Sequence, residues 1–532
     1  MKKLIYTLPL LLALGACSNE EVATPDPTQT PQSEGYYLTM NFSVPAEFSQ
    51  TRATQAQDPA LEKEILIEKL DVYLIDADAT QTGSEPAHTK DNVLWAATNI
   101  THDGAINFVT EKEPTDNRYD NTYNVKIKIT DIDDFAGKVM RHNLSVLVIA
   151  NNDKMAEATI TSMNVGAAPS TETFTFSGVK ECGAAGAVLP MTSHNYSDNT
   201  ITAFKTATTV AEVKSKFQPN GTELIYNLTH GTNGVTGDNK PIDVERAVAR
   251  LDFGTNAEWN YDLNDGETGG RAMTIKLNSL TPFNVNNISY VFRHGNNGTA
   301  TSAAETWTMF GNTASNAWIA DPTWNTTNGL GKTQPAINYL VTTGDSYSIN
   351  TNPDGTPAIN LKSSPEAGTY YPWIYISENT IPTTGLMAKE ADKLHTYATG
   401  VRFRFEIVDN DGNVVTSETN EEKLPLGVTF AGERNAQLQV TLFGSDTTQI
   451  FEGEGEGENE KHYYLDYYGY INHEEISSTG LVAMNYAIVR NTVYQMKINK
   501  ITSLPKPKDV TYWLTLDINV LKWDKRTVEF EF

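Results

Sequence analysis

The feature that most constrains this chain is a period-two alternation of apolar and polar residues, which recurs in short stretches along most of its length. Residues 36–44, 70–74 and 401–407 are examples. Successive side chains of a β-strand point to opposite faces, so the alternation gives each stretch one apolar face to bury. Turn-forming residues follow, as at 409–412. Short strands with frequent turns favour β-sandwiches over a parallel α/β sheet.

Helical patterns are few in this sequence. Residues 209–217 form the clearest one, and residues 387–395 form a second. Asp131, Asp133 and Asp134 are typical of a turn or of the first turn of a helix. We therefore expect a mainly β fold with few short helices.

A boundary between two domains is expected near residue 245. The loop-like residues 231–241 precede a strand that begins at Val244. The length of 532 residues also exceeds that of one ordinary domain. We expect an N-terminal β-sandwich domain at residues 53–244 and a C-terminal one at residues 245–510.

The first residues have the composition of an export signal. Lys2 and Lys3 precede an apolar run that is too short to span a bilayer permanently, and small residues then lead to Cys17. The Leu-Gly-Ala-Cys sequence at 14–17 resembles the lipobox of bacterial lipoproteins. That resemblance implies removal of residues 1–16 and acylation of Cys17 with fatty acids such as palmitate. The alternative is an ordinary signal peptide with a chance cysteine.

Charge and cysteine content exclude several kinds of function. The chain has 40 Lys and Arg against 66 Asp and Glu, a net charge of −26, which disfavours nucleic-acid binding because phosphates require a basic face. Its two cysteines, Cys17 and Cys182, cannot build a disulfide scaffold or a thiolate zinc site unaided. We expect Cys182 to be a small buried hydrophobe.

Motifs for catalysis or metal binding are incomplete. Asp409, Asp411 and Asn413 mimic the start of a calcium loop. The glycine and the glutamate that such a loop requires later are replaced by Val414 and Asn420, so a hairpin turn is the better interpretation. The sequence lacks a P-loop, a dinucleotide fingerprint and a nucleophile elbow. We therefore expect no catalytic residue, no metal and no cofactor.

The informative features lie at the two ends of the chain. Near the start, one strand face carries four alternating apolar residues: Leu38, Met40, Phe42 and Val44. The polar stretch that follows contains Arg52, the sole basic residue between Cys17 and Lys63. An arginine-specific protease would therefore have one site here, between Arg52 and Ala53, and would release the lipidated segment 17–52 with its strand.

The other end offers a similar strand. Residues 511–532 contain an alternating set of apolar residues followed by a tryptophan: Leu514, Leu516, Ile518, Val520 and Trp523. Loss of the first strand would leave unpaired backbone edges, and the tail of another copy has the pattern to fill the place, as in donor-strand complementation. Such head-to-tail contacts do not close and would build a filament. The alternative is that both segments are ordinary strands of one monomer.

Several segments together carry a family resemblance. They are the lipobox ending at Cys17, the Arg52-Ala53 junction, and residues 67–74, 146–151, 244–250, 488–494 and 518–523. In combination they resemble the fimbrillin family of lipoprotein-derived, or type V, pili of Gram-negative anaerobes of the Bacteroidales type. Within that family they are most similar to the major structural subunits of short, or minor, fimbriae. The most specific matches are the Val-Arg-Asn sequence at 489–491 with Tyr494, and the strand that ends in Trp523.

The resemblance implies a fold and a function. The fold would be two transthyretin-like β-sandwich domains. The function would be that of a structural pilin in the shaft of an adhesive fimbrium, lipidated at the outer membrane as a precursor and extracellular when mature. Arg52 would be the processing site of an arginine-specific protease, and residues 511–532 would be the donor strand. The partners would be further copies of the chain and the tip and anchor subunits.

Two alternatives stay open. The chain could be a tip or an anchor subunit of the same fimbrium, although tips are expected to lack a donor strand and anchors to keep their first strand. It could also be a surface glycan-binding lipoprotein, since 8 Trp and 24 Tyr can form stacking platforms. We expect most of these aromatic residues, Tyr463, Tyr464, Tyr467 and Tyr468 among them, to pack within or between strands.

Three arginines also lie in the matching segments: Arg246, Arg250 and Arg490. The resemblance draws attention to them. From the residues alone, they could simply be solvent-facing positions of strands.

Overall fold

The description of the fold rests on a computed structural model. The structure describes residues 35–44, 62–78, 92–101, 106–109, 121–156, 158–176, 180–182, 188–193, 200–228, 235–236, 242–254, 259–263, 273–296, 308–309, 318–323, 347–348, 370–380, 397–442, 447–455, 460–473, 486–505, 521–522 and 527–531. Most of these residues lie in strands. The prediction of a mainly β fold with few short helices is confirmed.

The largest sheet brings together strands from the first half of the chain. Its members are β1 (Gly35–Val44), β2 (Lys69–Asp76), β3 (Val93–Thr101), β4 (Ile106–Val109), β5 (Asn121–Ile129), β6 (Leu144–Ala150), β10 (Met191–Ser193), β11 (Thr200–Ile201), β12 (Gln218–Asn220), β13 (Glu223–Asn227), β14 (Val235–Thr236) and β15 (Ile242–Arg246). The main path runs β12-β13-β1-β15-β10-β6-β11-β14, so β1 is an internal strand.

Two sheets form the second half of the fold. The first contains β9 (Lys180–Glu181), β16 (Ala249–Gly254), β24 (Tyr370–Ile376), β30 (Thr492–Lys500), β31 (Leu521–Lys522) and β32 (Thr527–Glu531). The second contains β17 (Asn260–Leu263), β18 (Met273–Phe283), β23 (Tyr347–Ser348), β25 (Gly400–Ile407), β26 (Val428–Ala431), β27 (Gln437–Leu442), β28 (Thr447–Glu454) and β29 (His462–Tyr470).

The remaining strands form two small sheets. They are β7 (Ala158–Thr159), β8 (Thr173–Phe176) and β19 (Ile288–Tyr290) in one sheet, and β20 (His294–Asn296), β21 (Thr308–Met309) and β22 (Trp318–Ala320) in the other. β8 and β19 join the two halves of the chain, because β8 precedes β15 in the sequence and β19 follows β16.

Three short α-helices occur in the described part of the chain: α1 (Glu62–Ile65), α2 (Ile132–Val139) and α3 (Val210–Lys214). Short 3₁₀ turns lie at Pro169–Thr171, Glu421–Lys423 and Glu433–Asn435. α3 falls inside the predicted helical stretch 209–217, and Thr209 caps it with a capping box to Glu212. α2 begins where the Asp131 carboxylate accepts hydrogen bonds from the next backbone amides, which confirms the helix-start interpretation. The predicted helix at 387–395 lies outside the described residues.

The buried apolar side chains form two large hydrophobic cores. The first core is built around β1, β2, β5 and β6, and the second around β16, β18, β25 and β29. Val248 packs in the first core and Ala249 in the second, close to the predicted boundary near residue 245. The division into domains at 53–244 and 245–510 stays a prediction.

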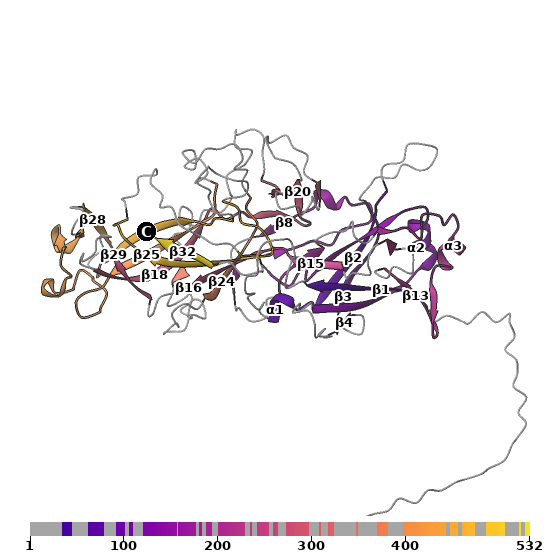
Figure 1. The fold of residues 1–532 in the computed structure, drawn as a ribbon, viewed down its shortest axis with the longest axis horizontal. Coiled ribbons are helices and arrows are strands. Elements are labelled where there is room, and N and C mark those ends of the chain that lie inside the picture. The colour runs from indigo at the N-terminus through magenta and orange to yellow at the C-terminus, as the bar shows by residue number, and fades with distance from the viewer. Residues whose placement is uncertain are drawn as a thin grey trace, which may run out of the picture.

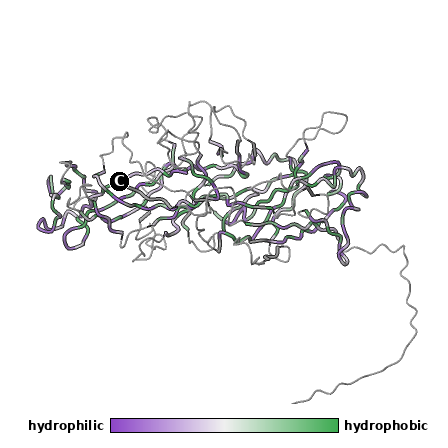
Figure 2. Tube along the Cα trace, in the orientation of Figure 1, coloured by the Kyte–Doolittle hydropathy of each residue, from purple (hydrophilic) through white to green (hydrophobic). Residues whose placement is uncertain are grey.

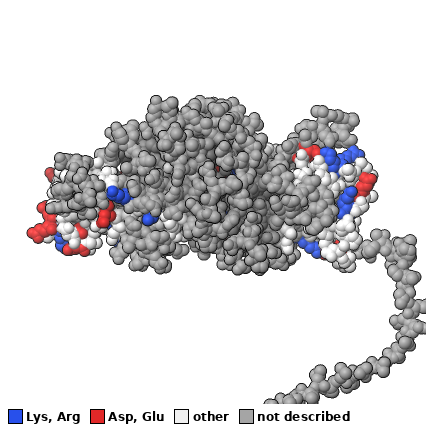
Figure 3. All heavy atoms as spheres, in the orientation of Figure 1, with Lys and Arg blue, Asp and Glu red and all other residues white. Residues whose placement is uncertain are grey.

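The two cores lie end to end in an elongated molecule (Figure 1), with β1, β2 and β15 in one half and β18, β25 and β29 in the other. Hydrophobic residues follow the strands inside both halves (Figure 2). Acidic side chains gather at the end that carries β28 (Figure 3), where Glu452 and Glu454 are exposed. No helix among the described residues is long and apolar enough to cross a bilayer.

Candidate functional site: the place of strand β1 in its sheet

Strand β1 lies between strands on both sides. It pairs antiparallel with β5 over residues 36–44. On its other side it pairs parallel with β13 through residues 35–39 and with β15 through Phe42 and Ser43. We call this place between β5 and the pair β13 and β15 the β1 slot. Without an occupant, the backbone edges of all three neighbouring strands would lose their hydrogen-bond partners.

The inner face of β1 carries the four apolar residues that the sequence singled out. Leu38, Met40, Phe42 and Val44 are each no more than 1% exposed and belong to the first core. Phe42 also stacks on Tyr123 of β5, with ring centroids 5.2 Å apart. Burial of four such side chains is worth on the order of 6–12 kcal/mol before ordering costs.

An ion pair crosses the outer face of β1. Lys126 of β5 and Glu223 of β13 stand on opposite sides of the strand, and Lys126 Nζ lies 2.6 Å from Glu223 Oε1. The same ammonium group lies 4.5 Å from the ring centroid of Tyr37 on β1, the geometry of a cation–π contact. On the opposite, inner face, neighbouring Tyr36 packs edge-on against Phe217 of the first core at 5.2 Å. We call Lys126 and Glu223 the clip.

Tyr123 connects the slot to the chain that follows the predicted cleavage site. Its hydroxyl donates to the Ile65 carbonyl oxygen at 2.7 Å and accepts from the Ile67 amide at 3.2 Å. Burial raises the pKa of Tyr123 to about 12, so the hydroxyl keeps its proton at physiological pH. α1 and the residues after it are therefore held against β5 by a neutral hydrogen-bonding group.

Glu64 of α1 lies in a buried charge cluster where the two cores meet. Its carboxylate accepts from Arg250 Nη1 at 2.8 Å and from the Tyr375 hydroxyl at 2.7 Å. Its backbone carbonyl accepts from Arg246 Nε at 2.9 Å. Arg250 is also paired with Asp252 at 2.7 Å. Burial is the largest single effect and lowers the pKa of Arg250, but the carboxylates of Asp252 and Glu64 together outweigh it, so the pKa is raised well above the ordinary value.

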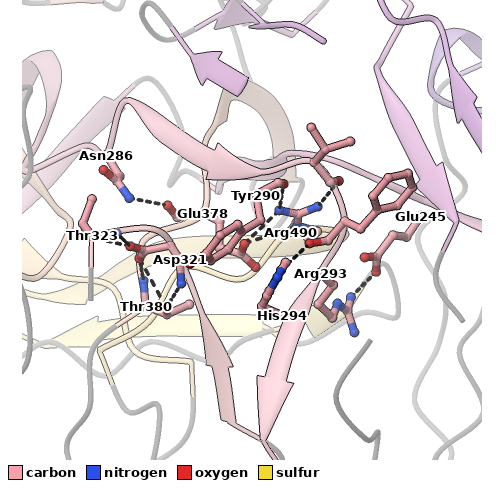
Figure 4. Close-up of polar contacts among 12 residues, drawn as sticks. Glu245, Asn286, Tyr290, Arg293, His294, Asp321, Thr323, Glu378, Thr380 and Arg490 are labelled. Carbon is pink, nitrogen blue, oxygen red and sulfur yellow. Dashed lines mark hydrogen bonds and ion pairs between the residues drawn. The ribbon is translucent and has the colours of Figure 1, made fainter. Parts of the chain in front are cut away.

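A second buried charge cluster surrounds Arg490 (Figure 4). Arg490 Nη2 lies 3.0 Å from Glu378 Oε2, and its Nη1 donates to the Val291 carbonyl at 3.0 Å. Burial raises the pKa of Glu378, although Arg490 opposes that shift. Nearby, Arg293 is ion-paired with Glu245 of β15. Because β15 belongs to the largest sheet, the pair of Arg293 and Glu245 connects this second cluster to the first half of the fold.

The solvent-facing interpretation of three arginines is wrong. Arg246, Arg250 and Arg490 are no more than 1% exposed. Desolvation lowers the pKa of Arg246 to about 10, which leaves it charged at neutral pH. Glu64 and Glu378, the distant acidic partners of Arg250 and Arg490, were missed because they lie 186 and 112 positions away in the sequence. One available signal was the apolar stretch at residues 247–249 between Arg246 and Arg250.

Tyrosines of β29 divide between the two faces of their sheet. Tyr463 and Tyr467 are buried in the second core, as expected. Tyr464 and Tyr468 are partly exposed, and the guanidinium of Arg404 lies 4.3 Å from the ring centroid of Tyr464. These four residues therefore pack within or on the sheet. Cys182 is also buried, as expected, and burial raises its pKa well above the ordinary value.

The other predicted site residues cannot be placed. The lipidation site Cys17, the processing residues Arg52 and Ala53, and the donor residues Leu514, Leu516, Ile518, Val520 and Trp523 lie outside the described residues. Two short parts of the terminal segment are described. β31 pairs antiparallel and β32 parallel with β30, in a sheet of the second half.

Comparison with protein-family models gives a match in the C-terminal segment of the chain. Residues 461–529 match the family model described as "Major fimbrial subunit protein type IV, Fimbrillin, C-terminal". This match confirms the resemblance to fimbrillins on the C-terminal segment, and it points to a structural rather than an enzymatic protein. No curated protein sequence matches the chain.

Similar solved structures include adhesion and fimbrial proteins. A putative cell adhesion protein from Parabacteroides distasonis is 13% identical, with a TM-score of 0.43 and coverage of 93% of this chain and 98% of that one. The tip fimbrial protein Mfa3 from Porphyromonas gingivalis, with C-terminal truncation, is 12% identical, with a TM-score of 0.28 and coverage of 87% and 94%. A putative cell adhesion protein from Bacteroides eggerthii is 11% identical, with a TM-score of 0.34 and coverage of 94% and 98%.

Proposed function

We propose that this fimbrial subunit forms the shaft of an adhesive cell-surface fimbrium and polymerises by donor-strand exchange. The precursor is a lipoprotein, anchored in the outer membrane through Cys17. An arginine-specific protease cuts after Arg52 and frees β1. The C-terminal segment 511–532 of another copy then fills the β1 slot, and repetition of this step builds the filament.

The observation that carries the proposal is the internal position of β1 together with its burial. Leu38, Met40, Phe42 and Val44 all point into the first core, and the neighbouring strands need a partner on the β1 side. Arg52 follows β1 in the sequence and precedes Glu64, which is anchored by Arg250. A cut at Arg52 therefore separates the strand from the anchored chain.

A β1 slot that has lost its strand is unstable, so binding of a new strand is favoured over an empty slot. Its apolar floor would be exposed to water, and its backbone edges would be unpaired. A strand with four apolar side chains at alternate positions restores both kinds of contact, and residues 514–520 have that pattern. Because the pairing covers a whole strand, dissociation is slow, which suits a fibre that must withstand force.

The experiment is limited arginine-specific proteolysis of purified precursor, followed by gel electrophoresis without boiling. We expect a ladder of oligomers only after cleavage at Arg52. Arg52→Ala should block the ladder, and Arg52→Lys should restore it when trypsin is used. A monomer band after complete cleavage would refute polymerisation by strand exchange.

Deletion of residues 511–532 separates the shaft role from that of a tip or an anchor. The truncated precursor loses the pairing of β31 and β32 with β30, but it should fold, since its slot is filled by its own β1 and β30 keeps its pairing with β16. It should be cleaved without forming a ladder. If it still polymerised, the donor would lie elsewhere in the chain. If the full-length chain were cleaved and only capped preformed filaments, it would be a terminal subunit.

A further inference from the structure

The two strand segments at the ends of the chain match position by position. Residues 36–44 read YYLTMNFSV and residues 512–520 read YWLTLDINV. The tyrosine, leucine, threonine and valine at the first, third, fourth and ninth positions are identical. At the second position Tyr37 is matched by Trp513, and elsewhere apolar residues match apolar ones and polar residues match polar ones.

We propose that residues 512–520 of a second copy occupy the β1 slot in the register and direction of residues 36–44, with Trp513 beneath Lys126 of the clip. This inference rests on the proposed strand exchange and specifies its geometry. Leu514, Leu516, Ile518 and Val520 then take the buried places of the inner face. Lys126 of the clip contacts the aromatic ring of Trp513 on the outer face.

Other registers fit the slot less well. A shift by two residues that puts Leu514 in the place of Tyr36 also puts Lys522 in the buried place of Val44. An unpaired lysine there would have to give up its hydration. The opposite shift puts Tyr512 in the place of Leu38, which is 0% exposed and has no room for a larger ring without repacking. A shift by one residue turns every apolar side chain to the outer face.

The outer face supports the same register. Lys126 Nζ lies over the ring of Tyr37 while it is bound to Glu223, so the ammonium is held in place by two strands that do not leave with β1. Tryptophan is the strongest cation–π partner among the aromatic side chains. Trp513 in the place of Tyr37 therefore strengthens the contact across the outer face. On the inner face, Tyr512 keeps the edge-on contact that Tyr36 makes with Phe217 of the first core.

Cysteine cross-linking tests the register directly in the full-length chain. Asn41 is paired with Asn124 of β5, and both are exposed. With Asn124→Cys, we expect Asp517→Cys to give a covalent ladder between copies after cleavage and mild oxidation. Thr515→Cys and Asn519→Cys, which report the two shifted registers, should give none. The native Cys182 is buried and does not compete.

The outcomes separate this inference from the proposed function. One outcome is a ladder of oligomers on gels of unboiled samples in which the copies are cross-linked through Thr515→Cys or Asn519→Cys. This result overturns the register and leaves strand exchange intact. A cross-link within one monomer overturns the assignment of the occupant to a second copy. Failure to form any ladder after cleavage at Arg52 refutes the exchange itself.

A double-mutant cycle tests the clip. Lys126→Met and Trp513→Ala should each speed polymer dissociation in detergent by about five-fold. The double variant should be little faster than either single variant, because both remove the same contact. Lys138→Met is the matched control, since Lys138 is as exposed as Lys126 and forms its ion pair with Asp134 within α2. Independent effects of Lys126→Met and Trp513→Ala would overturn the placement of Trp513.

Discussion

Glu64 and Arg250 form an ion pair of 2.8 Å in which both side chains are at most 1% exposed. Glu64 comes from α1, which packs beside the first core, and Arg250 comes from β16 of the second core. The first described segment after Arg52 is thus fixed where the two cores meet. In the proposed mechanism, this anchor keeps the body of the subunit folded while β1 departs.

Replacing Glu64 should destabilise the whole protein. Glu64→Ala removes a carboxylate that receives hydrogen bonds from Arg250 and Tyr375, and so takes an ion-pair partner from the buried Arg250. Loss of one partner from a buried ion pair costs about 3–5 kcal/mol. Urea unfolding of the precursor measures the change.

The control for this experiment is an exposed ion pair. Lys138→Met removes the pair with Asp134 on α2, where the side chains are 37% and 52% exposed. Such pairs contribute about 0–1 kcal/mol, so the midpoint of unfolding should scarcely move. If Glu64→Ala had an equally small effect, the anchoring role of Glu64 would be wrong.

Acid should weaken the protein in part through His294. Burial lowers the pKa of His294, chiefly by desolvation, and Arg490 adds to this effect. A lowered pKa means that the unfolded chain binds the proton more readily. The stabilising contribution is present above the unfolded value of about 6.5 and is lost as pH falls through the lower folded pKa. Chemical unfolding measured between pH 7 and 4 should show this fall.

His294→Gln tests the assignment. The substitution removes the titrating group, so the pH dependence of the unfolding free energy should become shallower below pH about 6.5 even if the variant is less stable overall. Parallel curves for the two proteins would show that His294 does not contribute to the acid sensitivity.

The turn after β25 should behave as a hairpin and not as a calcium site. The Asp409 carboxylate accepts from the backbone amides of Asp411 and Asn413 at 2.9 and 2.8 Å. Asp409→Ala removes these charge-assisted hydrogen bonds and should lower stability by about 1–2 kcal/mol. Differential scanning calorimetry should give the same melting temperature with calcium and with a chelator. A calcium-dependent rise would contradict this interpretation.

Local patterns predicted much of the fold because their causes are local. The alternation at residues 36–44 indicates which side chains β1 buries, and Thr209 with Glu212 specifies the start of α3. Asp409 marks a turn because its carboxylate bonds to amides a few residues away. In each case, the residues that form the contact lie side by side in the sequence.

The buried charge clusters could not be predicted in the same way. Glu64 and Arg250 are 186 positions apart, and Arg490 and Glu378 are 112 apart. A charged residue in a strand has the same local pattern whether it faces water or a distant carboxylate. Only the packing of two cores brings these partners together, so the sequence pattern does not identify them, even where an apolar stretch such as residues 247–249 adjoins the arginines.

Two separate alanine substitutions, one at Phe42 and one at Ile518, test the central claim that one strand replaces the other. Phe42→Ala should lower the unfolding free energy of the uncleaved precursor by about 3–5 kcal/mol, since Phe42 fills the slot and stacks on Tyr123. It should leave the polymer unaffected, because cleavage removes Phe42. Ile518→Ala should destabilise the polymer and leave the unfolding free energy of the uncleaved precursor unchanged.

The measurement is the melting of uncleaved precursor and of assembled polymer for both variants and the parent chain. We expect Phe42→Ala to lower only the precursor's melting temperature and Ile518→Ala to lower only the temperature at which the polymer dissociates. If Phe42→Ala weakened the polymer, or if Ile518→Ala left it unchanged, the tail of one copy would not be occupying the place of β1 in the next.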